Sequence, residues 1–283
     1  MVRASTLISV QWPPAPISAG PDTLVLSVGT YYVDLRIDRD DRSIYWALAG
    51  RRIVVCEEPR KVKFTHELDS HSPSASGTEE DGGEGAEEIA DEGTFTKLPN
   101  GDDLEVGEMP APHLGGKVAA YREVWRELDP GLEDSNTSGG DRESAEGKGN
   151  RTCWMLESLD TEGQERRKRR RTFYCRVGRF FLAIRRTERV SDQKGVEIEV
   201  EFSGIRQEEE ARPQADGGGK EWIVKYSLGS EVDGMFHMSR AEVVLENTTS
   251  GGGAVEWKVD DRVVVKNKSD GTIREVCVVR AVN

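Results

Sequence analysis

The sequence of 283 residues predicts an all-β protein with two small antiparallel β-barrels or sandwiches and little helix. Period-two alternation is the first observation: Tyr31, Val33, Leu35 and Ile37 alternate with more polar residues, as expected for a half-buried strand. The second is the scarcity of helical periodicity, for which a short turn near 230–238 is the best candidate. The third is a polar stretch that separates two halves of similar length.

The same alternation extends through both halves, and each segment is expected to have one apolar face and one polar face. In chain order, strands are expected at 5–12, 22–28, 31–38, 43–49, 51–56, 60–68, 103–108, 117–127, 151–158, 172–177, 179–187, 196–202, 222–228, 241–247, 254–258, 262–267 and 273–282. Tight turns are expected at Gly29, at Gly178 and at Asp270-Gly271, because glycine takes a positive φ without a steric penalty.

The domain organisation follows from where the polar segments lie. Residues 1–130 are expected to form an N-terminal barrel with a disordered acidic insert at about 70–92. Residues 131–150 are expected to be a flexible linker. Residues 151–283 are expected to form a second barrel with a polar insert at about 207–219.

Charge excludes several classes of function. The chain has 39 Lys and Arg against 52 Asp and Glu, a net charge of -13, which repels the phosphate backbone of nucleic acids. No apolar run approaches the length of a transmembrane span, and the N-terminus is too polar for a signal peptide. A cytoplasmic location is therefore expected.

Motifs for catalysis, metals and cofactors are missing from the sequence. The cysteines Cys56, Cys153, Cys175 and Cys277 form no C-x-x-C pair and are expected to be buried free thiols in strands. There is no G-x-S-x-G elbow and no P-loop, so no catalytic, cofactor-binding or metal-binding residue is predicted. An enzyme would need a polar cluster inside a barrel, for example His66 or Tyr32 with Arg36 and Glu67.

A basic run is the strongest local charge feature. It is expected to be a nuclear-import signal or a patch for an acidic partner, or else a solvated hairpin tip. The run consists of Arg166, Arg167, Lys168, Arg169, Arg170 and Arg171. An import signal would add the nucleus to the expected locations.

Two further sets of residues have candidate roles. Thr78, Thr94 and Ser138 lie beside acidic residues and are candidate sites for acidophilic kinases. Val33, Leu35, Trp46 and Leu48 are the candidate lining of a hollow barrel, which would bind a small hydrophobic ligand.

Several short segments in both halves resemble the fungal HRI protein family. In order, they are Ile8-Ser9-Val10-Gln11-Trp12-Pro13-Pro14, Tyr32-Val33-Asp34-Leu35-Arg36, Trp46-Ala47-Leu48-Ala49-Gly50, Tyr121-Arg122-Glu123-Val124-Trp125-Arg126 and Arg179-Phe180-Phe181-Leu182-Ala183-Ile184-Arg185. The resemblance implies two lipocalin-like barrels, no established catalysis, and interaction with a protein kinase of the casein-kinase-I type. The acidic insert at 71–90 and the basic run depart from the family pattern.

These observations predict a non-enzymatic protein that acts through partners. The carrier of a small hydrophobic ligand is the alternative, and an enzyme with a site inside a barrel is the third interpretation.

Overall fold

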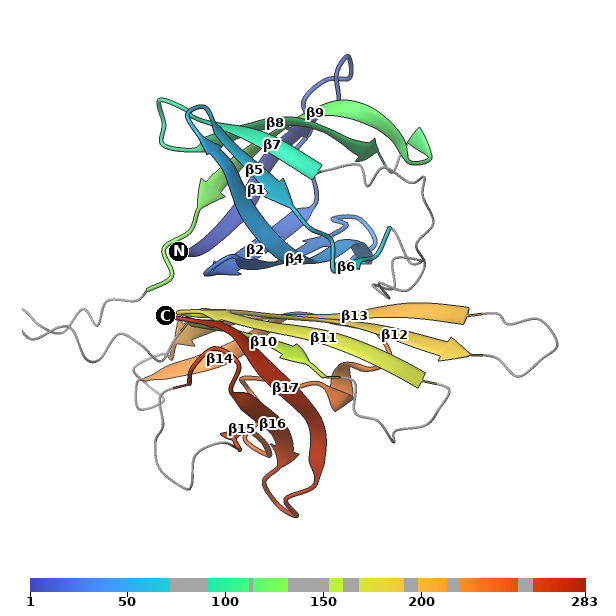
Figure 1. The fold of residues 1–283 in the computed structure, drawn as a ribbon, viewed down its shortest axis with the longest axis vertical. Helices are drawn as coiled ribbons and strands as arrows, with labels where there is room; N and C mark the ends of the chain where they lie inside the picture. The colour runs from blue at the N-terminus through green and yellow to red at the C-terminus, as the bar shows by residue number, and fades with distance from the viewer. Residues whose placement is uncertain are drawn as a thin grey trace, which may run out of the picture. The chain divides into compact units, whose positions relative to one another are not determined.

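The structure is a computed structural model that describes residues 1–71, 91–111, 114–131, 153–159, 168–190, 198–212, 219–248 and 257–283. The described chain forms two antiparallel sheets, as Figure 1 shows, and it also contains a single-turn 3-10 helix, η4 (Val232–Gly234). It divides into two compact units, one of Ser5–Val25 and Asp34–Leu128, and the other of Met1–Ala4, Leu26–Val33 and Asp129–Asn283. The all-β prediction is confirmed.

The N-terminal sheet is a closed barrel. Its strands are β1 (Val2–Gln11), β2 (Asp22–Val28), β3 (Tyr31–Ile37), β4 (Ile44–Glu57), β5 (Arg60–Phe64), β6 (Leu68–Asp69), β7 (Asp91–Lys97), β8 (Asp103–Ala111) and β9 (Lys117–Glu127). The order is β3-β2-β1-β9-β8-β7-β5-β4-β6, and a β3–β4 pairing closes the ring. The short strand β6 is attached to β4. Closure leaves no long unpaired edge in the ring.

The C-terminal sheet is curled but open. Its strands are β10 (Cys153–Ser158), β11 (Lys168–Val177), β12 (Phe180–Val190), β13 (Ile198–Ala211), β14 (Lys220–Leu228), β15 (Val243–Asn247), β16 (Arg262–Asn267) and β17 (Ile273–Val282). The eight strands follow the order β14-β13-β12-β11-β10-β17-β16-β15, with β14 and β15 as the two ends. Figure 1 shows the sheet bending from the long strands β11–β13 round to β15 and β16. The second domain is therefore a half-barrel.

One face of this curled sheet holds a continuous apolar core. It gathers alternate residues of successive strands, together with Met235 and Phe236 from the loop after η4. The strand members of the core are Trp154, Leu156, Tyr174, Phe181, Ala183, Ile205, Val243, Val263, Val265, Cys277 and Val279. Because these residues recur at every second position, the core face of each strand is known.

The turn predictions at glycine are confirmed. Gly29, between β2 and β3, has a φ of 62°, and Gly178, between β11 and β12, has a φ of 54°. Gly271, between β16 and β17, has a φ of 70°. A side chain is disfavoured in this region of backbone space, so glycine determines where these hairpins turn.

Element boundaries differ from the sequence prediction in several places. Strand β7 was not predicted, because Asp91 and Glu92 continue the acidic insert in composition. Strand β4 joins two predicted strands into one. Of the polar insert expected at 207–219, residues 207–211 belong instead to β13, and Gln207 is fully buried. Residues 213–218 lie outside the described residues. Gln207 donates to Ser239 and accepts from the Met238 amide, and these bonds compensate for its burial.

The cysteine prediction needs one correction. Cys153, Cys175 and Cys277 are buried free thiols, as expected, whereas Cys56 is exposed near the end of β4. The hydrophobic neighbours of Cys56 in the sequence are exposed as well, so apolar composition alone did not indicate burial there. Within the part of the chain that the structure describes, no helix is long and apolar enough to span a membrane.

Candidate functional site

A charged cluster lies inside the N-terminal barrel, centred on Arg36 of β3. The Arg36 guanidinium binds Glu123 of β9 through Nη1 at 2.8 Å. The same guanidinium binds Asp34 through Nη2 at 2.9 Å. Strands β3 and β9 are separated in the ring by β2 and β1, so the Arg36–Glu123 contact crosses the barrel interior. The Arg36 Cζ atom also lies 5.2 Å and 5.4 Å from the ring centroids of Trp46 and Trp125.

This contact corrects the predicted lining of the barrel. Asp34 and Arg36 reach into the interior, so the alternating residues Val33 and Leu35 lie on the opposite face of β3. Both are fully buried, although they do not share the face of Arg36. Trp46 contacts Arg36 and lies on the inner face of β4, and Leu48 shares that face by alternation. On this side the interior is therefore lined by Asp34, Arg36 and Trp46 together with the apolar Leu48, so two of the four predicted lining residues lie on the inner face.

Two buried carboxyls share the interior next to Arg36. Burial raises the pKa of Glu105 to about 8, and the neighbouring Glu123 and Asp91 add to this effect. Burial also raises the pKa of Glu123, although Arg36 opposes the shift. The Tyr121 hydroxyl donates to Glu105 Oε1 at 2.9 Å. Near neutral pH, one carboxyl of the pair holds a proton because two adjacent buried carboxylates repel each other.

A second node is centred on His66. Its Nδ1 lies 2.9 Å from Asp69 Oδ2, and its Nε2 lies 3.0 Å from Asp91 Oδ2. Burial disfavours the imidazolium, but hydrogen bonds to Asp69 and Asp91 outweigh this effect and raise the pKa of His66 to about 9. Asp69 also accepts from Trp46 Nε1 at 2.8 Å, which links this node to the inner face of β4.

Some polar atoms in this region have no hydrogen-bond partner. These buried atoms are Asp34 Oδ1, Asp91 Oδ1 and Trp125 Nε1. The described residues contain no group of three or more His, Cys, Asp or Glu side chains suited to hold a metal ion. The cluster thus has the chemistry of a polar binding site, with acceptors and a donor available for hydrogen bonds.

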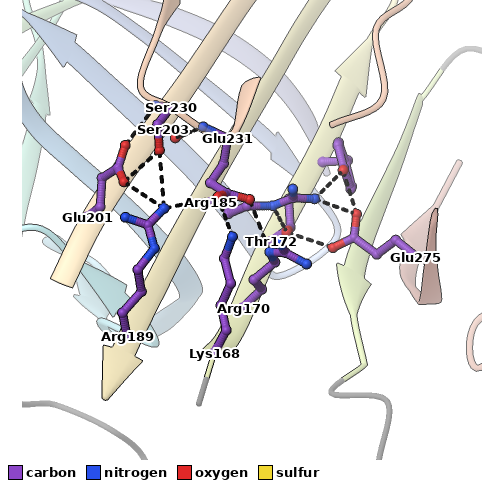
Figure 2. A network of polar contacts seen from close by, with 11 residues as sticks. Lys168, Arg170, Thr172, Arg185, Arg189, Glu201, Ser203, Ser230, Glu231 and Glu275 are labelled. Carbon is purple, nitrogen blue, oxygen red and sulfur yellow. Dashed lines mark hydrogen bonds and ion pairs between the residues drawn. The ribbon is translucent and has the colours of Figure 1, made fainter. Parts of the chain in front are cut away.

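The C-terminal sheet carries a second charged site, which continues the core face of its strands. On β11, Lys168, Arg170 and Thr172 alternate in register with the core residue Tyr174. On β12, Arg185 lies two residues beyond the core residue Ala183 on the same face. Each strand therefore passes from apolar to charged side chains along one face, and Figure 2 shows the charged end.

Arg185 and Glu275 form the buried half of this site. Arg185 Nη2 binds Glu275 Oε2 at 2.8 Å, and their side chains are 3% and 9% exposed. The hydroxyls of Thr172 and Tyr174 donate to the two Glu275 oxygens at 2.7 Å and 2.6 Å. Burial and the Glu275 charge raise the pKa of Tyr174, which therefore remains a hydrogen-bond donor. These bonds hold the Arg185 guanidinium in one orientation.

Glu231, just before η4, organises the more exposed half. It accepts from Lys168 Nζ at 2.5 Å, from Arg170 Nε at 3.1 Å and from Arg189 Nη2 at 3.2 Å (Figure 2). Partial burial would raise the pKa of Glu231, but the hydrogen bond from Lys168 and the nearby charges of Arg170 and Lys168 keep it below its usual range. The backbone N–H of Glu231 donates to Ser203 of β13, which fixes the loop against the sheet.

A pocket of about 480 Å³ lies among these groups. It is lined by Ser158, Leu159, Lys168, Arg170, Arg185, Glu231, Asp233, Gly234, Arg274 and Glu275. The lining comes from β10, β11, β12, β17 and the η4 turn, so residues far apart in the sequence form it. The volume falls within the usual range for small-molecule sites.

The structure shows where most of the basic run lies. Lys168, Arg169, Arg170 and Arg171 are part of strand β11 and pair with β12, so they are not a hairpin tip. Lys168 and Arg170 bind Glu231, and Arg171 binds Glu157. These ion pairs restrain three of the side chains that an import receptor or an acidic partner would contact. Arg166 and Arg167 lie outside the described residues, and the import role stays a prediction.

Of the candidate phosphorylation sites, only Thr94 lies in the described part of the chain. It is in the middle of β7, between Lys61 of β5 and Val106 of β8. A kinase binds its substrate segment as a free chain, so modification of Thr94 would require β7 to open locally. Thr78 and Ser138 lie outside the described residues, and all three sites stay predictions.

Sequence reasoning missed most of the residues in both sites. The polar cluster considered for an enzyme included Arg36, but the structure pairs Arg36 with Asp34 and Glu123 rather than with Glu67. Glu275 and Glu231 were missed because a single carboxylate in a strand or loop carries no local signal. The run of four cations at the start of β11, followed by Thr172 and Tyr174 on the core face, was the available indication that this face changes character along the strand.

Comparison with known proteins identifies the family. The chain matches the family described as Protein HRI1 over residues 3–261. A crystal structure of the uncharacterised protein YLR301w from Saccharomyces cerevisiae is similar, with a TM-score of 0.57 and 17% identity over 100% of this chain and 99% of that chain. At that identity the likeness concerns the fold, and no curated protein sequence matches. Because the family match covers most of its length, the chain belongs to the HRI1 protein family.

Proposed function

We propose that this protein is a non-enzymatic binding protein that acts through a partner, and that the partner is a protein kinase of the casein-kinase-I type. The observation that carries the non-enzymatic part is the pairing of two candidate acid–base groups, His66 and Glu231, with charged partners. His66 is held between two carboxylates, and Glu231 is held by three cations. Groups held by such charge pairs are poorly suited to exchange protons with a substrate.

The kinase part of the proposal rests on the family resemblance and on charge. Kinases that prefer acidic surroundings present basic surfaces, and this chain has a net charge of -13. The acidic residues between 79 and 88 are the proposed contact: Glu79, Glu80, Asp81, Glu84, Glu87 and Glu88. Attraction between opposite charges accelerates association, and salt weakens this attraction.

This proposal is tested by measuring how fast the full chain binds to surface-immobilised kinase. Replacement of the acids between 79 and 88 by Asn or Gln is expected to lower the association rate about tenfold at low salt. The control replaces a second acidic set in the same way, namely Glu133, Asp134, Asp141, Glu143 and Glu146, and is expected to bind normally. Absence of binding by the native chain would overturn the kinase assignment.

A second candidate function is that of a small-ligand carrier, with the ligand inside the N-terminal barrel. The observation that favours it is the set of buried polar atoms without partners, Asp34 Oδ1 and Trp125 Nε1 among them. These atoms favour a polar ligand over the hydrophobic one expected from sequence. Native mass spectrometry of protein from its own host tests it. A mass excess of a few hundred daltons that is lost on denaturation is expected, and its absence contradicts the carrier function.

A further inference from the structure

The pocket of the C-terminal sheet has features that neither a kinase partner nor a barrel ligand uses. It lies entirely in the unit that contains Asp129–Asn283. Its cationic lining residues are Lys168, Arg170, Arg185 and Arg274, and its acidic lining residues are Glu231, Asp233 and Glu275. The Asp233 side chain is 86% exposed, and its Oδ1 accepts from Arg240 Nη2 at 2.8 Å, outside the lining. The remaining lining has an excess of positive charge.

Arg274 provides much of this excess. Its Nε donates to Asn267 Oδ1 at 2.6 Å, and its Nη1 donates to the backbone carbonyl of Asp233 at 3.1 Å. Both acceptors are neutral, and no carboxylate among the described residues pairs with Arg274. The guanidinium is therefore positioned by hydrogen bonds while its charge is not neutralised.

Arg170 and Lys168 supply further donors on another side of the pocket. Arg170 uses its Nε on Glu231, and within the described ranges neither of its Nη groups has a protein partner. The Lys168 ammonium has three N–H groups, and its described contact is with Glu231. These donors come from β11, whereas Arg274 comes from β17. Cations from separate strands thus line one cavity.

The frame behind these donors is rigid. Arg185 is fixed by Glu275 and Thr172 in the buried part of the site, as Figure 2 shows, and its Nη2 also donates to the Tyr174 hydroxyl. Glu231 restrains Lys168 and Arg170 and leaves N–H groups of both available. A preorganised set of donors loses little entropy when a ligand binds.

We propose that this pocket binds a small molecule that carries a phosphate group. A phosphate has several charged oxygens that accept from guanidinium and ammonium donors in different directions at once. The volume of about 480 Å³ accommodates a compact phosphate ester, and the acidic surface of the chain disfavours nucleic acids. Glu275 and the exposed Asp233 carboxylate can accept from hydroxyl groups on the rest of such a molecule.

Calorimetric titration of the full chain at low salt is the first test. Inorganic phosphate and glycerol phosphate are the two probes, and each is expected to saturate one site per chain. Tighter binding of glycerol phosphate would identify an ester as the ligand class, and equal binding would identify free phosphate. If neither probe gives saturable binding at millimolar concentration, the proposal is wrong.

Variants locate the binding within the pocket. Arg274→Gln is expected to weaken phosphate affinity roughly tenfold or more, because it removes a charged donor, and Arg274→Lys is expected to restore part of the loss. Arg262→Gln is the matched control: Arg262 is an exposed arginine of β16, in the same sheet and outside the pocket lining, and its loss is expected to leave affinity unchanged.

If Arg274→Gln does not fold stably, Arg170→Gln tests the same pocket. Arg170→Gln leaves Glu231 paired with Lys168 and Arg189, and is also expected to weaken binding roughly tenfold. Melting temperatures of all variants are measured without ligand. Phosphate binding that persists unchanged in a folded Arg274→Gln or Arg170→Gln chain would overturn the assignment. A failure of this kind would leave the kinase proposal intact, because the two proposals use different residues.

Discussion

At the scale of single residues, Arg36 is a buried cation inside the N-terminal barrel. Arg36 is 8% exposed and is bound to Asp34 and Glu123, which are also buried. A buried ion pair contributes little net stability relative to apolar residues of the same shape, but loss of one partner leaves a charge without compensation. The barrel interior is therefore sensitive to the loss of this side chain.

Arg36→Met is expected to lower the free energy of unfolding by about 3–5 kcal/mol, because two buried carboxyls lose their shared cation. Urea denaturation measures the change. Arg212→Met removes an arginine from an exposed pair with Glu221, in which the side chains are 48% and 39% exposed. This control is expected to cost at most about 1 kcal/mol. Equal effects of the two substitutions would contradict the role given to Arg36.

Glu105 makes stability depend on pH. Its folded pKa of about 8 lies above its ordinary value of 4.5, so the folded state holds the proton more tightly than the unfolded chain. The stabilisation is complete below pH 4.5 and is lost as pH rises through 8. His66, whose pKa is raised from 6.5 to about 9, adds to this loss of stability as pH rises from about 6.5 through 9.

Glu105→Gln is therefore expected to flatten the decline of unfolding free energy between pH 5 and 8, which for one group is at most roughly 1.4 kcal/mol per pH unit. The amide can still accept from Tyr121. Denaturation curves at several pH values measure the slope. Glu108→Gln, on the exposed face of the same strand, is expected to keep the native slope. A Glu105→Gln chain with an unchanged slope would contradict the assignment.

At the scale of elements, the charged site of the C-terminal sheet depends on how a loop joins the strands. Gly229 follows β14 and has a φ of 108°. A Cβ at this position would lie 2.6 Å from the Ser203 Cα atom, so β13 and the loop approach closely here. The Ser203 hydroxyl in turn accepts from the Glu231 backbone amide. The close approach therefore determines the position of the Glu231 carboxylate, which binds Lys168 and Arg170.

Gly229→Ala is expected to cost about 3 kcal/mol of stability, from the positive φ and from the contact with Ser203. The substitution is also expected to displace Glu231 and to weaken phosphate binding. Gly271→Ala is the control, because its φ of 70° is also positive but no atom lies within 4 Å of an added Cβ. Its expected cost is about 1 kcal/mol. Thermal denaturation distinguishes the two, and equal costs would show that the Ser203 contact is unimportant.

At the scale of the whole molecule, the net charge is -13, but the cations are distributed unevenly. Many of the arginines take part in internal ion pairs, and some of them gather around the C-terminal pocket. A local excess of positive charge in an acidic protein selects small anions, since large polyanions are repelled by the surrounding surface.

The thiols provide a test of the whole fold. Cys56 is exposed, whereas Cys153, Cys175 and Cys277 are buried. Burial raises the pKa of the Cys175 and Cys277 thiols, so their reactive thiolate forms are scarce. Intact-mass analysis after treatment with N-ethylmaleimide is expected to show one adduct on the folded chain and four in denaturant. More than one adduct before unfolding would contradict the packing of the strands that carry these residues.

The sequence by itself determined the all-β class, most strand positions and the hairpins at Gly29, Gly178 and Gly271. These features depend on local backbone preference and on side-chain alternation, both of which are encoded within a few residues. Alternation distinguishes two faces of a strand without indicating which face is enclosed. That is why Val33 and Leu35 were expected to line the barrel, whereas Asp34 and Arg36 lie on its inner face and Arg36 meets Glu123 there.

Only the tertiary structure decided which charged residues meet. Arg36 and Glu123 are paired because a ring closed by β3 and β4 places β3 and β9 across one interior. Lys168, Arg185, Glu231 and Arg274 line one pocket because a curled sheet and the η4 turn bring four chain segments together. Ring closure and curvature are properties of strand order, and strand order depends on contacts between residues far apart in the sequence.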